Sequence, residues 1–124
     1  MRVMILAKSS PETESAQRPT EDSQEGYEAM GKFTQELIGA GILKDEGRLL
    51  PTSSGARVRV RGKKQTVVDG PFLEAKEIVA GYWIWEVQSL GEAIEWLERA
   101  PFGDGQELEV RPILDAPEGW PQQR

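Results

Sequence analysis

The residue types best suited to chemistry are concentrated in one short segment of the second half of the chain. Asp69-Gly70-Pro71-Phe72 is followed closely by Glu74 and Lys76. A carboxylate whose pKa is raised by burial can act as a general base, so Asp69 and Glu74 are the candidate catalytic residues. Lys76 can hold an anionic substrate and Phe72 can form an apolar wall, so these two are candidate ligand-binding residues.

The same segment also has a structural interpretation. The Asp69 carboxylate can accept hydrogen bonds from nearby backbone amides. Gly70 and Pro71 can set a bend in the chain, and Phe72 can fill a core. Turns of this composition are common, so the structural interpretation is slightly favoured, and the functional one stays open.

Tyr82 and Trp83 are further candidate ligand-binding residues, because aromatic rings can line a pocket for a flat ligand. With Trp85 they belong to a segment rich in β-branched and aromatic residues, which predicts a buried strand. Aromatic residues in such a strand more often belong to the core or to a subunit interface, and this interpretation is favoured here.

Residues 57–64 hold the main concentration of basic side chains, and no aromatic residue is interleaved with them. Stacking platforms for nucleic acid are therefore missing. The net charge of −6 also disfavours binding to nucleic acid or to an anionic membrane. We expect a solvated hairpin face with neither partner, made by Arg57, Arg59, Arg61, Lys63 and Lys64.

Cysteine and histidine are both absent from the sequence. Their absence excludes disulfides, thiol nucleophiles and thiolate metal sites. It also removes the commonest general base and the commonest transition-metal ligand. Carboxylates alone can bind a hard cation, but no spacing indicates such a site. We expect no metal and no cofactor.

No apolar stretch approaches the length of a membrane span. The apolar start, residues 1–7, is too short to be a signal peptide and too soon followed by polar residues. We therefore expect a cytoplasmic protein.

Hydrophobic periodicity and turn residues predict a single domain at residues 1–114 with a polar tail at 115–124. Helical spacing of apolar residues after Thr20 predicts a helix that stops at Gly39 and Gly41. Ser89-Leu90-Gly91-Glu92 is typical of a capping box and predicts a second helix, which Pro101 ends. The predicted strands are residues 1–7, an irregular one at 42–51, a hairpin of 56–61 and 65–68, and strands at 78–87 and 107–113.

This order predicts an α+β fold. Without the hairpin it is the split βαβ arrangement of ferredoxin-like folds, so the expected fold is ferredoxin-like with an inserted β-hairpin. In that arrangement residues 1–7 and 78–87, the most apolar strands, occupy the centre of the sheet.

Both faces of the predicted sheet are apolar. In residues 1–7, Val3 and Ile5 point one way and Met4 and Leu6 the other. In residues 78–87, Trp83, Trp85 and Val87 share one face, and Tyr82 and Ile84 share the opposite one. Two helices cover only one of these faces. A second copy of the sheet is the simplest way to cover the other face, so we expect a homodimer. The alternative is that the hairpin or the tail folds over the open face.

Several segments together resemble the YCII-related, DGPF-domain family. The similarity runs from Met1 to about Ile113, and the ordered series is more specific than any one motif. It rests on Gly55-Ala56-Arg57-Val58-Arg59, Asp69-Gly70-Pro71-Phe72, Glu74, Lys76, Glu77, Gly81-Tyr82-Trp83, Glu86-Val87-Gln88-Ser89, Glu92-Ala93-Ile94-Glu95-Trp96 and Glu109-Val110-Arg111-Pro112.

The resemblance implies a dimeric α/β-barrel of ferredoxin-like subunits, and it implies an association with genes for extracytoplasmic-function sigma factors. A related branch of the family carries a His and Asp pair thought to be catalytic, and one such member is a dehydrochlorinase. This chain has no histidine, so that mechanism is not transferred to it.

Three hypotheses for function follow. The leading one is a dimeric small-molecule-binding or regulatory domain with a pocket between the sheets or beside the Asp69 loop. The second is a cofactor-independent lyase or isomerase that moves a proton with Asp69 or Glu74. The third, suggested only by the resemblance, is a protein partner in a sigma-factor-linked stress response.

Overall fold

The computed structural model describes residues 1–9, 24–70 and 78–122, and of Asp69 it describes the backbone alone. The helices and strands follow the predicted order. They are β1 (Arg2–Lys8), α2 (Gln24–Gly39), β2 (Leu43–Arg48), the 3-10 turn η1 (Thr52–Ser54), β3 (Ala56–Arg61), β4 (Lys64–Asp69), β5 (Val79–Glu86), α3 (Leu90–Glu98) and β6 (Leu108–Pro112).

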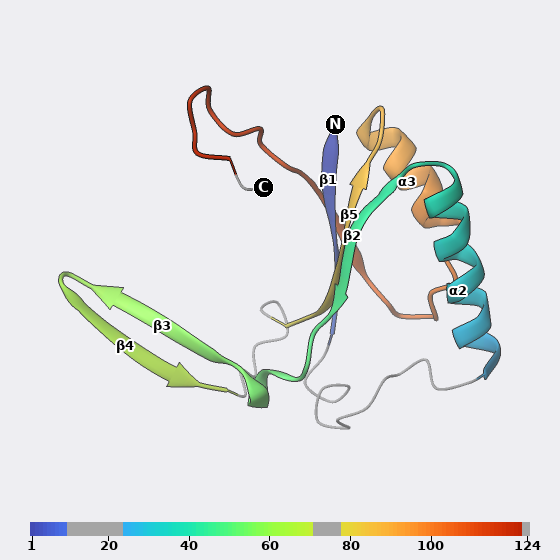
Figure 1. Cartoon of the computed structure of the whole chain (residues 1–124). Coiled ribbons are helices and arrows are strands. Elements are labelled where there is room, and N and C mark those ends of the chain that lie inside the picture. Colours follow the sequence, from blue (N-terminus) through green and yellow to red (C-terminus); the bar gives the residue numbers. More distant parts are fainter. Residues whose placement is uncertain (10–23, 71–77, 123–124) are drawn as a thin grey trace.

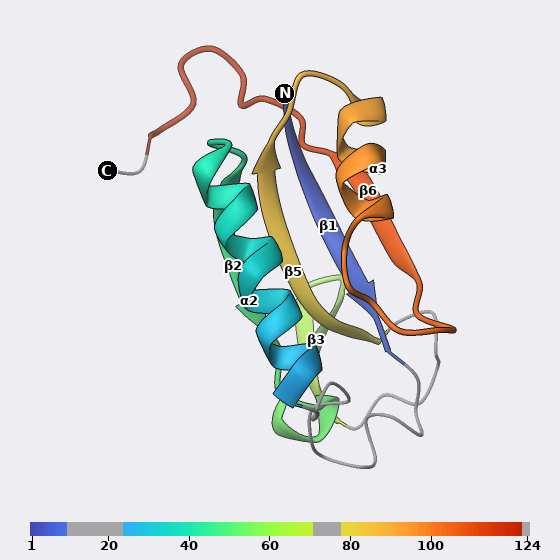
Figure 2. The ribbon, with the colours of Figure 1, turned by 90° about the vertical axis from the view of Figure 1, so that its right-hand side faces the viewer.

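Four strands form an antiparallel sheet in the order β2-β5-β1-β6. The two most apolar strands, β1 and β5, are central, as predicted, and β6 with its proline is an edge strand. Helices α2 and α3 lie on the same face of this sheet (Figures 1 and 2). The predicted α+β class and split βαβ order are therefore confirmed.

Alternate residues of the central strands build the core on the helix side of the sheet. Val3 lies opposite Trp85 and Ile5 opposite Trp83, and all four side chains are buried. The rings of Trp83 and Trp85 stack with centroids 5.2 Å apart, and Phe33 of α2 approaches Trp83 at 5.9 Å. Burial of this aromatic layer is the main apolar contribution that holds the helices on the sheet.

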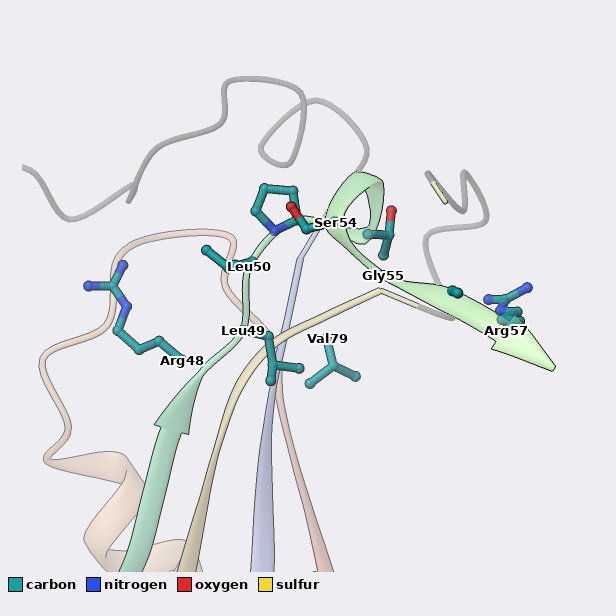
Figure 3. A pocket seen from close by; sticks show the side chains of 10 residues that line it. Arg48, Leu49, Leu50, Ser54, Gly55, Arg57 and Val79 are labelled. Carbon is teal, nitrogen blue, oxygen red and sulfur yellow. The ribbon is translucent and has the colours of Figure 1, made fainter. Parts of the chain in front are cut away.

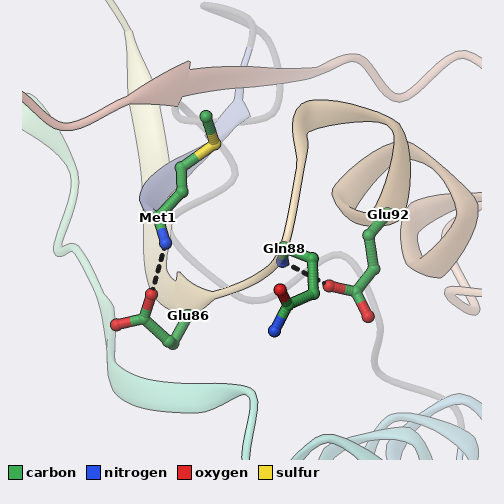
Figure 4. Close-up of polar contacts among 4 residues, drawn as sticks. All are labelled: Met1, Glu86, Gln88 and Glu92. Atoms are coloured by element: carbon green, nitrogen blue, oxygen red, sulfur yellow. Dashed lines mark hydrogen bonds and ion pairs between the residues drawn. The ribbon is translucent and has the colours of Figure 1, made fainter.

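Both helix ends that the sequence predicts are explained by local hydrogen bonds or backbone geometry. The Ser89 hydroxyl accepts a hydrogen bond from the Glu92 amide at 3.1 Å, and the Glu92 carboxylate accepts one from the Gln88 amide at 2.6 Å (Figure 4). This reciprocal pair is a capping box that reaches one residue further back than usual. Helix α2 is followed by Gly41, whose φ of 75° only glycine adopts easily. The predicted cap of the first helix, Thr20, lies outside the described residues.

Strands β3 and β4 form a separate two-stranded sheet, which we call the arm (residues 56–69). Its tight turn includes Gly62, with a φ of 64°. The arm projects away from the main sheet on the side opposite the helices (Figure 1). Neither arm strand makes extensive contact with another described helix or strand.

The second face of the main sheet carries Met4, Leu6, Tyr82 and Ile84, which we call the open face. These four side chains are only partly buried, and neither α2 nor α3 lies on this face (Figure 1). The arm and the tail both extend outward from this side instead of lying flat across it (Figure 1). The alternative in which one of them folds over its own sheet is therefore not what the structure shows.

Candidate functional site

The candidate segment begins where the arm returns to the body of the protein. Asp69 is the last residue of β4 and pairs with Ala56, the first residue of β3. The Gly70 amide donates a hydrogen bond to the Gly55 carbonyl at 3.1 Å. Four residues named for this segment in the sequence analysis lie outside the described residues: Pro71, Phe72, Glu74 and Lys76.

Gly70 occupies a position that no larger residue can take. A Cβ atom placed on it would lie 1.6 Å from the carbonyl oxygen of Thr52 and 2.4 Å from the carbonyl carbon. Such an approach between two backbones requires glycine. The glycine of the candidate segment therefore has a structural reason, namely close packing of the arm's root against η1.

A pocket of about 440 Å³ lies beside this junction (Figure 3). Leu49 and Val79 lie side by side in it, with the Arg48 and Arg57 side chains on opposite sides of them (Figure 3). Its lining comes from the end of β2, from η1 and from the first residues of β3 and β5. The lining residues are Arg48, Leu49, Leu50, Pro51, Thr52, Ser54, Gly55, Ala56, Arg57 and Val79.

The pocket exists because β2 is shorter than the predicted segment 42–51. The strand has a bulge between Leu43 and Asp45 and ends at Arg48. Pro51 has a φ of −55°, which suits the start of the η1 turn, and the turn redirects the chain into the arm. The Leu49 amide still donates a hydrogen bond to the Ala80 carbonyl at 2.8 Å, and beyond it the backbone leaves the sheet edge and curves around a space before it enters β3 at Ala56.

Sequence reasoning missed the pocket residues before the arm. The apolar pair Leu49-Leu50, placed before a proline and three small polar residues, was interpreted as the end of a weak strand. In the structure Leu49 and Leu50 are 50% and 77% exposed, so this pair does not belong to the core. The sequence pattern alone does not distinguish a pocket floor from a strand end.

Tyr82 and Trp83 do not line a common pocket, because they lie on opposite faces of β5. Trp83 is in the core, and its indole Nε1 donates a hydrogen bond to the Glu46 carboxylate at 3.3 Å. The Tyr82 ring lies on the open face against Gly47, where a Cβ atom would be 2.6 Å from the ring. This geometry gives Trp83 a packing role and leaves Tyr82 available on the open face.

Among the described residues, two carboxylates, Glu86 and Glu109, have clear pKa shifts, and both are partly exposed ion-pair partners. The N-terminal ammonium group lies 2.6 Å from Glu86, and its hydrogen bond lowers the pKa of that carboxyl (Figure 4). A hydrogen bond from Lys8, at 2.9 Å, likewise lowers the pKa of Glu109. A lowered pKa makes a carboxylate a poorer base, so neither group suits proton abstraction.

The rest of the described chain offers little for acid-base or metal chemistry. No polar or charged residue among those described is buried. Within the same residues there is no cluster of three or more side chains that could hold a metal ion. No helix in residues 24–70 or 78–122 is long and apolar enough to cross a membrane.

One comparison with known proteins assigns a family, and none assigns an activity to this chain. The family model described as YCII-related domain matches residues 1–117. An uncharacterized protein of Rhizobium meliloti (strain 1021) is 31% identical over 96 residues, which covers 75% of this chain and 77% of that protein. The solved structure of 5-chloro-2-hydroxyhydroquinone dehydrochlorinase (TftG) from Burkholderia phenoliruptrix AC1100, in complex with 2,5-dihydroxybenzoquinone, has a TM-score of 0.44 and 18% identity, covering 88% of this chain and 91% of that one.

Proposed function

The chain belongs to the YCII-related domain family, and on that premise we propose that it is a cytoplasmic homodimer that binds a small molecule in the pocket at the root of the arm. The proposal has two parts, the pocket and the dimer, and each has its own support and its own test.

The pocket is the observation that carries the binding function. Its volume of about 440 Å³ suits a metabolite-sized molecule. Its apolar lining includes Leu49, Leu50 and Val79, while Arg48 and Arg57 supply guanidinium groups at its two sides. An apolar floor with a few polar groups that fix orientation is the usual composition of a small-molecule site. A guanidinium carries five N–H donors, so it can hold a protein contact and still bind a ligand.

The open face supports the dimer. Met4, Leu6, Tyr82 and Ile84 form an apolar surface on the two central strands, and no helix covers it. Contiguous apolar surfaces of this kind usually mark an interface. A two-fold dimer with the two open faces in contact would bury this surface on both copies. Two such sheets packed face to face would form the α/β-barrel that the family resemblance implies.

The described residues offer no carboxylate suited to act as a base. A carboxylate base needs burial or a neighbouring negative charge to raise its pKa. No charged residue among those described is buried, and Glu86 and Glu109 have lowered pKa values. The candidate bases, the Asp69 side chain and Glu74, are not among the described residues, so a carboxylate-dependent lyase or isomerase is the second candidate function.

A thermal-shift screen against a metabolite library tests the binding site. A ligand at about a hundred times its Kd stabilises the protein by roughly 2.7 kcal/mol, which raises Tm by several degrees. Ala56→Trp should remove the shift, because Ala56 lines the pocket and an indole would occupy it. Glu95→Trp is the matched control, because Glu95 is exposed on α3 and is not among the residues that line the pocket. Asp69→Ala is run alongside to test the candidate segment.

Retention of the shift by Ala56→Trp would place the ligand elsewhere and contradict the proposal. Loss of the shift in Asp69→Ala, with the variant still folded, would extend the site to the candidate segment and justify turnover assays.

Sedimentation equilibrium tests the dimer. Ile84→Asp places a charge at the centre of the open face, and burying it against a second copy is unfavourable. We expect the wild type to be dimeric and Ile84→Asp to be monomeric with an unchanged circular dichroism spectrum. Glu95→Asp is the control that adds no charge and should stay dimeric. A monomeric wild type would contradict the proposal.

A further inference from the structure

We propose that the arm clasps the second copy of the chain through its valine face, and that this contact holds one wall of the ligand pocket in place. The pocket would then be complete only in the dimer. The inference rests on the proposed homodimer and pocket, and it adds the surface that links them.

The arm has two chemically different faces. Val58 lies opposite Val67, and Val60 follows Val58 by two residues, so the three valines share one face. They are 58%, 67% and 64% exposed in the order Val58, Val60, Val67. The opposite face carries Arg57, Arg59, Arg61, Thr66 and Lys64, with the half-buried Val68 opposite Arg57 at the root of the arm. A hairpin with one apolar and one cationic face is built to place the apolar face on another surface.

The described residues of the same chain offer the arm no such surface. Neither of its strands makes extensive contact with another described helix or strand. An isolated two-stranded hairpin is only marginally stable in water. Packing of its valine face on a second molecule would supply the missing apolar contact.

Direction and charge identify the second molecule as another copy of this chain. The arm extends on the open-face side of the sheet, which is the side a second copy would occupy (Figures 1 and 2). Residues 56–69 hold five of the 15 basic side chains and one of the 21 acidic ones. The arm is therefore cationic and the rest of the chain strongly anionic. In a two-fold dimer each arm would place its valine face on an anionic body. Its cationic face would stay in water, but the opposite net charges of arm and body still oppose the repulsion between the two bodies.

The arm also forms part of the pocket. Ala56 and Arg57 are its first two residues, and both line the pocket. Gly70, just after the arm, packs its backbone on Thr52, another lining residue. The orientation of the arm therefore sets the position of one pocket wall. An arm held by a second copy preorganises that wall and lowers the entropy lost on binding.

Coupling between the two events must be reciprocal. If dimerisation orders the pocket and so tightens ligand binding, bound ligand tightens dimerisation by the same factor. The protein would thus be a binding domain whose ligand shifts it toward the dimer.

Single-cysteine labelling tests the clasp directly, because the chain has no native cysteine. A bimane fluorophore is attached at Val60→Cys on the valine face, or at Thr66→Cys on the cationic face as the matched control. We expect the Val60→Cys label to emit at shorter wavelength in the dimer and to shift to longer wavelength as dilution dissociates it. The Thr66→Cys label should stay in water at every concentration.

Hydrogen exchange tests the link to the pocket. The Gly55 amide donates to the Thr52 carbonyl and the Gly70 amide to the Gly55 carbonyl. In Val60→Asp we expect the dimer Kd to rise roughly ten-fold or more and these amides to exchange faster. Thr66→Asn, which alters the cationic face without changing its charge, should change neither.

The outcomes separate this inference from the proposals it rests on. A protein that is monomeric at all concentrations overturns the homodimer and the clasp together. A dimer in which both labels report water overturns the clasp alone. The third outcome is a dimer in which the Val60→Cys label is buried but Val60→Asp leaves hydrogen exchange of the Gly55 and Gly70 amides unchanged. This outcome overturns the link between the clasp and the pocket.

Discussion

Gly70 shows how a single position in the candidate segment is constrained by backbone packing. Its approach to the Thr52 carbonyl leaves no room for a Cβ atom. Gly70→Ala should therefore force the arm's root away from η1 and destabilise the protein by about 1–3 kcal/mol, the usual range for overpacking. Urea denaturation measures this loss.

Gly103→Ala is the matched control for that change. A Cβ atom at Gly103 would meet only the end of the Gln106 side chain at 3.9 Å. Equal stability of the Gly70→Ala variant and the wild type would show that the junction between arm and η1 is loose in solution.

Glu86 should make stability depend on pH. The hydrogen bond from the N-terminal ammonium lowers its pKa in the folded protein from the ordinary value of 4.5. A carboxyl with a lowered folded pKa adds stability above its unfolded pKa, and this contribution is lost as pH falls through the folded pKa.

Glu86→Gln should therefore have a lower Tm than the wild type near neutral pH, and the difference should disappear in acid below the folded pKa. The difference will be small because the pair is exposed and screened. Melting curves at a series of pH values measure it, with Glu95→Gln as the control. A difference that stays constant with pH would show that the ion pair does not form in solution.

At the scale of elements, helix α2 carries a glycine that packing does not require. Gly31 is exposed in the middle of the helix, and a Cβ atom there would meet nothing within 4 Å. Alanine is the better helix former by about 1 kcal/mol. Gly31→Ala should stabilise the protein by roughly that amount.

A glycine-to-alanine substitution in β2 should instead lower the stability of the protein. Gly47→Ala would place a Cβ atom 2.6 Å from the Tyr82 ring. Denaturant midpoints of the two variants provide the comparison, and destabilisation by Gly31→Ala would mean that this face of α2 is covered in solution.

For the arm, the sequence predicts the local structure correctly but not the position in the molecule. Strict alternation and a tight turn predict its strands correctly from sequence, since both are local properties. Its position in the molecule is not set by local sequence. The three valines of its apolar face are exposed and contact no surface among the described residues of the same chain. A contact with a second copy resolves this difference in the proposed dimer.

At the scale of the whole molecule, the open face makes stability depend on concentration. Folding coupled to dimerisation raises Tm with protein concentration by mass action. For a dimer of two 124-residue chains, a ten-fold increase in concentration should raise Tm by about 3 °C. Differential scanning calorimetry measures this slope.

Ile84→Asp should abolish the dependence of Tm on concentration, because its charge opposes pairing of the open faces. A wild-type Tm that is the same at all concentrations would argue against dimerisation through this face.

The sequence by itself determined the order of the elements, the central positions of β1 and β5, the division of β5 into two faces and the hairpin that forms the arm. These features follow from periodicity, turn residues and caps, which act over a few residues. Tertiary structure alone decided the early end of β2, the pocket it creates, the need for glycine at position 70 and the pairing of Glu86 with the N-terminus. Each of these joins segments distant in sequence, and such contacts depend on how the sheet and the arm are placed in space.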